Sequence, residues 1–246
     1  METDSSKPAF KRILLKLSGE ALMGPTEYGI HSRTVESICS QIKKIKDYGV
    51  EIGLVVGGGN IFRGVHASER GMDRVVGDNI GMLATVMNSL ALMDMLEKMG
   101  IYTRVMSAVR IEAFAETYIR RRAVRHLEKG RLVIFAAGTG NPYFSTDTAA
   151  SLRAMEINAE LFIKATSVDG VYSADPKKDS SAVFFPKLSY MDILTRELKV
   201  IDSTAVSLLM GSKIPLRIIN LTREGNLERV ILGEDIGTLV TRKGQE

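Results

Sequence analysis

Short apolar segments alternate with helical patterns along almost the whole chain. The first segment is Arg12–Leu17, and His31–Tyr48 follows it with apolar side chains every three or four positions, ending at Gly49. The other segments predicted as strands are Gly53–Val56, Tyr102–Met106, Arg131–Ala137, Leu161–Ala165, Pro215–Asn220 and Thr238–Thr241. Repeated strand–helix alternation favours a mostly parallel sheet with both faces covered. The sequence therefore predicts an α/β fold, a three-layer α/β/α sandwich.

The domain organisation is simple. Residues 1–10 are polar and are expected to form a flexible N-terminus without the apolar core of a signal peptide. No repeat, low-complexity tract or flexible linker interrupts residues 11–246. We therefore expect a single domain there, with two lobes that meet at a ligand cleft.

Composition excludes several classes of protein. The longest uncharged stretches, Asn79–Met93 and Leu132–Thr146, have 15 residues each, fewer than the roughly 17 to 25 that span a bilayer. A single cysteine, Cys39, excludes an internal disulfide, and three scattered histidines give no metal-binding spacing. We expect no metal held by protein side chains alone, and a cytoplasmic location.

The segment Asp78–Gly100 is apolar on all sides of its predicted helix. A helix of this kind must be buried on all sides. It is either the central helix of the domain or a helix with one face packed on a second subunit.

Positive charge is concentrated in Arg104–Arg131, which holds eight basic and three acidic residues, whereas the whole chain has a net charge of +4. This segment could form a solvated or oligomer-facing helix, bind a phosphate-bearing effector, or bind nucleic acid. Aromatic residues make up 6% of the chain and tryptophan is absent, so a base-stacking surface is poorly supported.

Three glycine-rich loops follow predicted strands: Ser18–Glu20, Gly57–Asn60 and Gly138–Pro142. In a parallel α/β sheet ligands bind beyond the carboxyl ends of the strands, where glycine lets backbone N–H groups approach phosphate oxygens. The P-loop, dinucleotide-binding, protein-kinase and nucleophile-elbow motifs are all absent. Phosphate must therefore be bound in another way.

Two cations stand beside these loops. Lys16 lies inside an apolar strand, where it either extends its ammonium group to solvent or reaches a phosphate on the next loop. Arg63 follows the second loop and could clamp a phosphoryl group or form a surface ion pair. After the third loop, Thr146 or Asp147 is expected to cap a helix, while Thr139 and Asn141 suit hydrogen bonds to a base or sugar.

The segments Lys16–Glu20, Gly57–Asn60 and Lys164–Tyr172 resemble the amino-acid kinase family. Further segments resemble the bacterial branch of that family that phosphorylates UMP: Phe62–Gly64, Arg74–Asp78, Met82–Asn88 and Ala137–Asp147. The similarity extends from Lys11 to Thr241. It implies the amino-acid kinase fold, and transfer of the ATP γ-phosphoryl group to UMP with Mg²⁺ in pyrimidine nucleotide biosynthesis.

The resemblance also implies roles for individual residues. Those expected near the reacting groups are Lys16, Arg63, Asp147 and Asp202. Those expected to bind ATP are Lys16, Leu17, Ser18, Gly19, Gly59, Arg63, Thr166, Tyr172 and Asp175. Those expected to bind UMP are Gly58, Asp78, Thr139, Gly140, Asn141, Pro142, Tyr143, Phe144, Ser145 and Thr146.

Assembly and regulation are further expectations. The resemblance suggests a homohexamer built as a trimer of dimers, GTP as an activator and UTP as an inhibitor, with no membrane partner. Two other functions stay open at this point: phosphorylation of a different substrate by a kinase of the same family, and a nucleotide-sensing or nucleic-acid-binding regulator.

Overall fold

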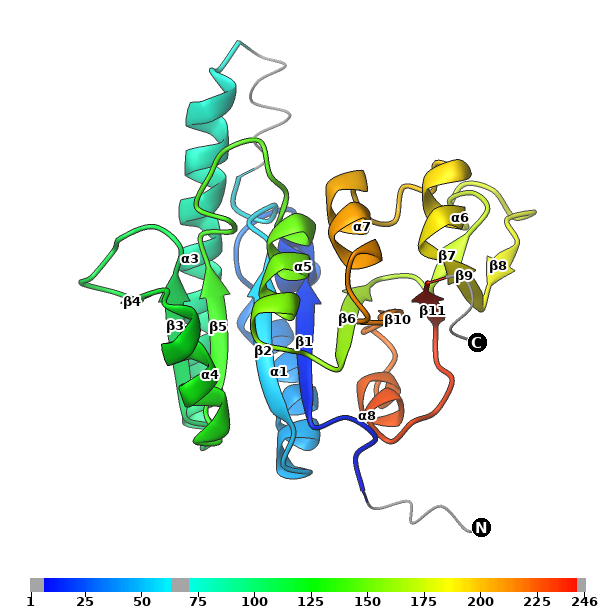
Figure 1. Ribbon diagram of the computed structural model, residues 1–246. Helices are drawn as coiled ribbons and strands as arrows, with labels where there is room; N and C mark the ends of the chain where they lie inside the picture. The colour runs from blue at the N-terminus through cyan, green and yellow to red at the C-terminus, as the bar shows by residue number, and fades with distance from the viewer. Residues whose placement is uncertain (1–6, 63–70, 243–246) are drawn as a thin grey trace.

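The computed structural model describes residues 7–62 and 71–242, and its centre is a nine-stranded sheet in the order β4-β3-β5-β2-β1-β6-β10-β11-β9 (Figure 1). Every neighbouring pair is parallel except β10–β11. The strands are β1 Arg12–Leu17, β2 Glu51–Val56, β3 Thr103–Ser107, β4 Glu116–Thr117, β5 Leu132–Ala136, β6 Leu161–Thr166, β9 Lys187–Ser189, β10 Leu216–Asn220 and β11 Thr238–Thr241. The predicted α/β sandwich is confirmed.

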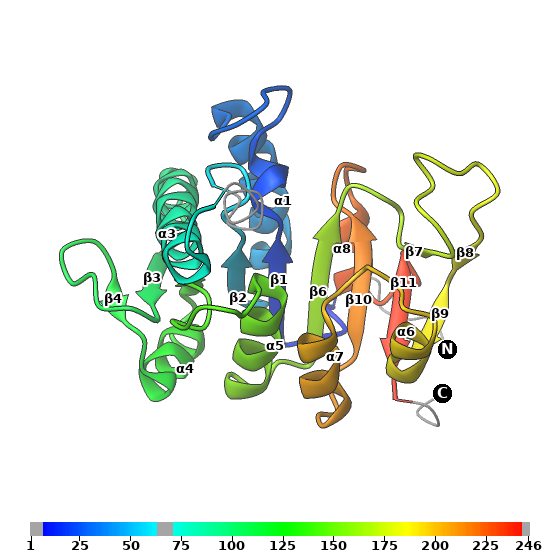
Figure 2. The same cartoon turned by 90° about the horizontal axis from the view of Figure 1, so that it is seen from above.

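Helices cover both faces of the sheet (Figure 2). One face packs against α1 Ser32–Asp47, α3 Arg74–Lys98 and α8 Asn226–Ile231. The other face packs against α4 Arg120–Glu128, α5 Thr146–Glu156, α6 Tyr190–Thr195 and α7 Ser203–Met210. Alternate residues of β1 serve the two cores, because successive strand side chains point to opposite faces: Ile13 and Leu15 join the first core and Leu14 the second.

Two smaller elements lie at the carboxyl ends of the strands. The one-turn 3₁₀ helix η1, Gly19–Leu22, directly follows β1. A separate two-stranded sheet pairs β7 Val171–Tyr172 with β8 Phe184–Phe185 in antiparallel fashion. It lies outside the backbone ladder of the main sheet.

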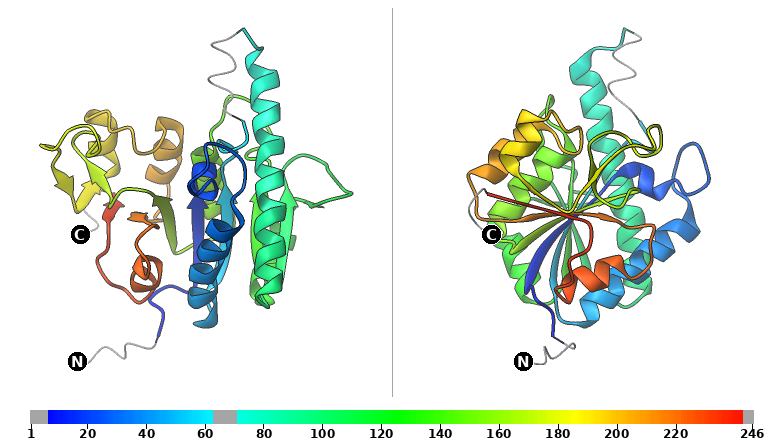
Figure 3. Two further views of the ribbon diagram at one scale, coloured as in Figure 1. Left: turned by 180° about the vertical axis from the view of Figure 1, so that it is seen from behind. Right: turned by 90° about the vertical axis from the view of Figure 1, so that its right-hand side faces the viewer.

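The helix α3 differs from its prediction in two ways. It starts at Arg74, earlier than Asp78, because the Asp73 side chain caps it by accepting a hydrogen bond from the Val76 N–H at 3.0 Å. In addition, Leu92 and Leu96 are fully buried whereas Leu83 and Met87 are more than half exposed. The helix therefore has one buried face, and it extends beyond the carboxyl ends of the strands (Figure 3).

By length and apolar composition alone α3 would be able to cross a membrane. In this fold one face of it packs along β3 and β5 and against α1, and Leu83 and Met87 are exposed on another.

Candidate active site

The glycine loops after β1 and β2 touch each other at the carboxyl edge of the sheet. A Cβ atom at Gly19 would lie 2.6 Å from Asn60 Oδ1 and 2.7 Å from the Gly59 backbone nitrogen. No side chain fits in that space, so glycine is required for the two loops to approach. Backbone N–H groups of both loops are thereby brought to one place.

The helix α3 fixes the second of these loops. Asn88 and Asn60 form a reciprocal, buried pair of side-chain amide hydrogen bonds of 2.9 and 2.7 Å. Asn88 also donates to the Gly57 carbonyl at 2.7 Å. A Cβ atom at Gly58 would lie 2.7 Å from the Gly81 carbonyl oxygen of α3. Helix and loop are therefore packed backbone to backbone.

Two buried lysines stand side by side in the middle of the sheet. Lys16 of β1 and Lys164 of β6 are register partners on neighbouring strands. Asp147, in the first turn of α5, pairs with both: its Oδ1 lies 2.8 Å from Lys16 Nζ, and its Oδ2 accepts a hydrogen bond from Lys164 Nζ. Lys164 also donates to the Val200 carbonyl at 2.5 Å.

The environment of this cluster shifts its titrations. Burial alone would raise the pKa of the Asp147 carboxyl, but the ammonium groups of Lys16 and Lys164 outweigh burial and hold that pKa below its usual value of 3.8. Burial lowers the pKa of Lys164, against the opposing attraction of Asp147. The cluster carries two cations and one anion, which leaves positive charge to attract a further anion.

The expectation that Thr146 or Asp147 caps the following helix is wrong. Ser145 is the N-cap of α5, and its hydroxyl accepts hydrogen bonds from the backbone N–H groups of Asp147 and Thr148. The Asp147 side chain is thus free to pair with the lysines. The physical reason is position. Asp147 is the second residue of α5, so its side chain points from the first turn toward the lysines of β1 and β6. An N-cap residue instead turns its side chain back to the first N–H groups of its own helix.

Asp202 joins the starts of two helices. It caps α7 by accepting from the Ala205 N–H at 2.9 Å, and it accepts hydrogen bonds from the hydroxyls of Ser145 and Thr148. The N-termini of α5 and α7 therefore meet beside the lysines. Helix N-termini stabilise anions, so this edge of the sheet is suited to phosphate.

A cavity of about 370 Å³ opens between α3, the loop after β5 and the start of α7. On one wall Asp78 pairs with Arg74, both of its oxygens lying 2.9 Å from Nε, and it accepts a hydrogen bond from the Tyr143 N–H at 2.8 Å. The loop after β5 adjoins this wall and also lines the cavity, and in it Ala137, Gly138, Gly140 and Tyr143 all have positive φ. The Thr85 hydroxyl of α3 accepts from the Ala137 N–H at 2.8 Å and so anchors that loop.

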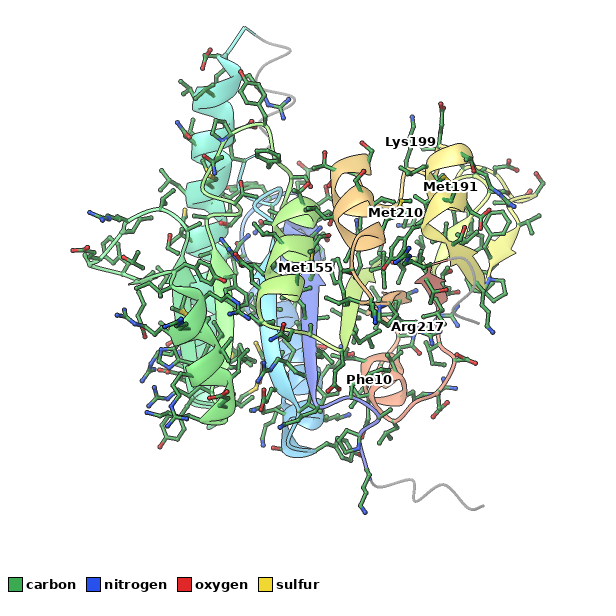
Figure 4. All side chains as sticks on the ribbon, viewed as in Figure 1. Phe10, Met155, Met191, Lys199, Met210 and Arg217 are labelled. Atoms are coloured by element: carbon green, nitrogen blue, oxygen red, sulfur yellow. The ribbon has the colours of Figure 1, made fainter. Side chains whose placement is uncertain are left out.

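Two further cavities continue from the first toward the small sheet. One of about 500 Å³ is lined by Asp147 and Lys164, and it shares Asp202 with the first cavity. The other, of about 560 Å³, lies against Tyr172 and Asp175. These two share the segment 197–200, from which Lys199 extends above the sheet between α6 and α7 (Figure 4). The three cavities form a row with the lysine cluster at its middle.

Most residues expected to bind ligands line this row. Those at the first cavity are Gly58, Gly59, Asp78, Thr139, Asn141, Tyr143, Phe144, Ser145, Thr146 and Asp202. Gly140 and Pro142 belong to the same loop without lining the cavity, and the Leu17 side chain is buried in the core. Thr166 bonds within its own turn, donating to the Val168 carbonyl at 2.7 Å. Arg63 lies outside the described residues.

Sequence analysis assigned no role to three residues at this site: Lys164, Asn88 and Arg74. Lys164 had the same signal as Lys16, a charge inside an apolar strand, and could have been found by it. The Arg74–Asp78 ion pair is an i,i+4 pair within one helix, and that spacing could have indicated it. The asparagine pair joins two separate segments whose contact no local pattern reveals. Within residues 7–62 and 71–242 no group of three His, Cys, Asp or Glu side chains could hold a metal ion.

Comparisons with known proteins give a consistent result. A sequence model of the amino acid kinase family matches residues 11–220. The structure of a UMP kinase from Bacillus anthracis has 42% sequence identity and a TM-score of 0.92, covering 96% of this chain and 97% of that one. A UMP kinase from Ureaplasma parvum has 35% identity, a TM-score of 0.88 and coverage of 94% and 99%. A uridylate kinase from Archaeoglobus fulgidus has 30% identity, a TM-score of 0.73 and coverage of 93% and 99%.

Proposed function

The chain belongs to the amino acid kinase family, and from that premise we propose that it is a UMP kinase, which transfers the γ-phosphoryl group of ATP to UMP and yields UDP and ADP. The observation that carries the proposal is the row of three cavities with Asp147 and Lys164 lining the middle one. A row of this kind accommodates an acceptor nucleotide, the transferred group and a donor nucleotide in line. The reaction belongs to pyrimidine nucleotide biosynthesis.

The acceptor UMP occupies the first cavity in this proposal. Its uracil and ribose lie along the loop of Thr139 to Thr146, and Asp78 accepts hydrogen bonds from the ribose hydroxyls. The phosphate lies at Gly58, close to the N-terminus of α5. A phosphate monoester is largely dianionic near pH 7, so it attacks without a strong base.

The lysine cluster neutralises the charge of the transferred group. Phosphoryl transfer depends on alignment and charge compensation more than on covalent chemistry with the protein. Lys16 and Lys164 supply the cations, and Asp147 holds both ammonium groups at fixed positions before substrate arrives. Arg63 is proposed as a third cation on the transferred phosphoryl group.

The donor ATP occupies the third cavity with its nucleoside, against Tyr172 and Asp175. Its phosphates are proposed to lie over Ser18, Gly19 and Gly59, and Thr166 is proposed as a further ATP contact. Gly59 lines the first cavity, whereas Ser18 and Thr166 line a separate cavity of about 640 Å³ beside η1 and α1. Mg²⁺ is proposed to arrive with ATP, and when bound it would neutralise charge on the phosphates. Asp202 lines the first and the middle cavity, and its oxygens already accept hydrogen bonds from two hydroxyls and an N–H group. Because no group of three carboxylate, imidazole or thiol side chains among the described residues could hold the ion, the phosphate oxygens of ATP and water would supply most of its ligands.

Assembly and regulation are part of the proposal. The exposed apolar stripe Val76, Leu83 and Met87 of α3 is suited to packing on a second subunit, and we propose a cytoplasmic homohexamer, a trimer of dimers. Arg120, Arg121 and Arg122 are exposed at the start of α4, where a polyphosphate such as GTP could bind and activate. UTP is proposed as an inhibitor. The two lobes are the UMP side and the ATP side of the row of cavities.

The test is turnover by the purified protein with ATP, Mg²⁺ and UMP, followed by chromatographic detection of UDP and ADP. Carbamate, acetylglutamate and aspartate serve as alternative acceptors in parallel reactions. Formation of UDP with UMP, and no ADP with the other three, is expected. Turnover with one of those acceptors and none with UMP would instead assign the chain to another activity of the same family.

A further inference from the structure

The small sheet of β7 and β8 forms a wall of the third cavity but has little stability of its own. It contains only two residue pairs, Val171 with Phe185 and Tyr172 with Phe184. A hairpin this short is not stable in water by itself. It also shares no ladder with the nine-stranded sheet within the described part of the chain (Figure 2). Other contacts must therefore hold it in place.

Thr238, the first residue of β11, provides such a contact. Its hydroxyl accepts a hydrogen bond from the Val171 N–H at 2.8 Å and donates one to the Phe185 carbonyl at 2.6 Å. It thus bridges both strands of the small sheet, and the Thr238 side chain is fully buried. The adjacent Leu239 N–H donates to the Pro186 carbonyl at 2.9 Å, which continues the attachment in the backbone.

The backbone at Gly170 lies in direct contact with the Thr238 side chain. A Cβ atom at Gly170 would lie 2.4 Å from Thr238 Oγ1 and 2.7 Å from the Phe184 ring. Two residues further on, the Tyr172 ring packs on Phe184 with ring centroids 5.3 Å apart. The hydroxyl therefore fixes the backbone one residue before the aromatic side chain that lines the cavity.

We infer that Thr238 is a positioning residue for the donor nucleotide, and the inference rests on the proposed function insofar as the third cavity is the nucleoside site of ATP. Thr238 does not line that cavity, and it lies beyond residues 11–220 that the family model matches. It acts through the Val171 N–H and the Phe185 carbonyl, which hold Tyr172 at the cavity wall. A residue of β11, the last strand but one of the main sheet, thereby sets the shape of the donor site.

The chemistry of the contact defines the right variants. A hydroxyl donates and accepts at once, whereas the isosteric valine side chain does neither. Thr238→Val therefore keeps the packing volume but removes the hydroxyl partner of a buried N–H and of a part-buried carbonyl. Thr238→Ser keeps both hydrogen bonds and loses only a methyl group.

The experiment measures donor binding without turnover, by calorimetric titration of adenylyl imidodiphosphate with Mg²⁺ into the full-length protein. Thr238→Val is expected to weaken binding roughly ten-fold or more, the effect of one or two buried groups left unpaired. Thr238→Ser is expected to bind like the natural protein, and UMP affinity is expected to be unchanged in both. Undiminished nucleotide binding by Thr238→Val, an equal loss for UMP, or no recovery in Thr238→Ser would overturn the inference. A protein that binds the ATP analogue but does not phosphorylate UMP would refute the proposed function alone.

A second measurement covers the case in which Thr238→Val does not fold. Hydrogen exchange of single backbone amides in the natural protein, without nucleotide, should show the Val171 amide as strongly protected as amides inside the main sheet. Thr238→Ser should keep that protection. Exchange of the Val171 amide at the rate of exposed loops would contradict a fixed hairpin and so the role of Thr238.

Discussion

At the scale of single residues, the arrangement of Lys16, Lys164 and Asp147 places two like charges on neighbouring strands, where each is almost wholly buried. Two adjacent cations in a sheet repel each other, and burial removes the water that would screen them. The Asp147 carboxylate, which pairs with both ammonium groups, offsets this repulsion and the cost of burying the two charges. The net positive charge that remains is what an incoming phosphoryl group requires.

Replacing Lys164 by methionine should therefore reduce the rate and spare the fold. Removing one fixed cation from the transferred group is expected to lower kcat about 100-fold or more, while Asp147 keeps Lys16 as its partner. Steady-state kinetics with ATP and UMP measure this. Lys43→Met is the matched control, because Lys43 is half-exposed and its ion pair is with Asp47 of its own helix. A Lys164→Met enzyme with normal kcat would remove Lys164 from the chemistry.

Asp147→Asn, unlike Lys164→Met, should lower the stability of the fold, by an amount that depends on pH. Two buried lysines lose their counter-ion, which is expected to lower the free energy of unfolding by about 3 kcal/mol at pH 7. The folded-state pKa of Asp147 lies below 3.8, so its contribution is complete above the unfolded-state value and declines as pH falls through the folded-state value.

The difference between the two proteins should accordingly be constant from about pH 5 to 7 and shrink below about pH 4. Urea unfolding at a series of pH values measures it. A difference that grew on acidification would contradict the assigned charge state of Asp147.

At the scale of elements, the contact between α3 and the loop after β2 leaves no room for a side chain at Gly58. Gly58→Ala must push the helix from the loop, and with it Asp78 from the rest of the first cavity. A Kd for UMP at least ten-fold higher and a lower Tm are expected, as for other overpacked sites. Calorimetry and thermal unfolding measure these two quantities.

Gly81→Ala is the stability control for this variant. A Cβ atom at Gly81 would meet no atom within 4 Å, so the change should raise helix propensity and stabilise the protein by about 0.5 to 1 kcal/mol. If Gly58→Ala and Gly81→Ala shifted Tm in the same direction, the close contact would not exist in solution.

The elements themselves were largely predictable, and their contacts were not. Arg12–Leu17 and Thr238–Thr241 were predicted with the bounds that the structure gives. The first is buried along nearly its whole length between two parallel neighbours, whereas the second alternates buried and half-buried residues. The start of α3 was missed because Asp73 acts as a cap through its side chain, and the cap of α5 was misassigned among neighbouring polar residues. The Asn60–Asn88 pair and the Thr238 bridge depend on distant segments meeting, which no local period encodes.

At the scale of the whole molecule, the exposed stripe of α3 is the surface on which the proposed assembly depends. Val76, Leu83 and Met87 lie on one side of the helix, and each is about half exposed. Replacing both Leu83 and Met87 by glutamate is expected to reduce the mass of the assembly to half or less, because charge at the centre of an apolar contact opposes association. Light scattering measures the mass. Lys98→Ala, at an exposed ion pair on the same helix, is the control that should leave the mass unchanged.

The central place of β1 has a consequence for the growing polypeptide. β1 pairs on one side with β2, which is made soon afterwards. Its other neighbour is β6. At the end of that second pairing the Lys11 N–H donates a hydrogen bond to the Glu160 carboxylate, and these two residues lie 149 positions apart. At about 5 to 20 residues per second, ribosomes need roughly 7 to 30 s to make that length. During this time one edge of an almost wholly apolar strand is open to other nascent chains. Synthesis at high expression is therefore the moment at which this protein is most exposed to aggregation. Less frequent initiation of translation, which lowers the number of nascent chains without lengthening this interval, should increase its soluble yield.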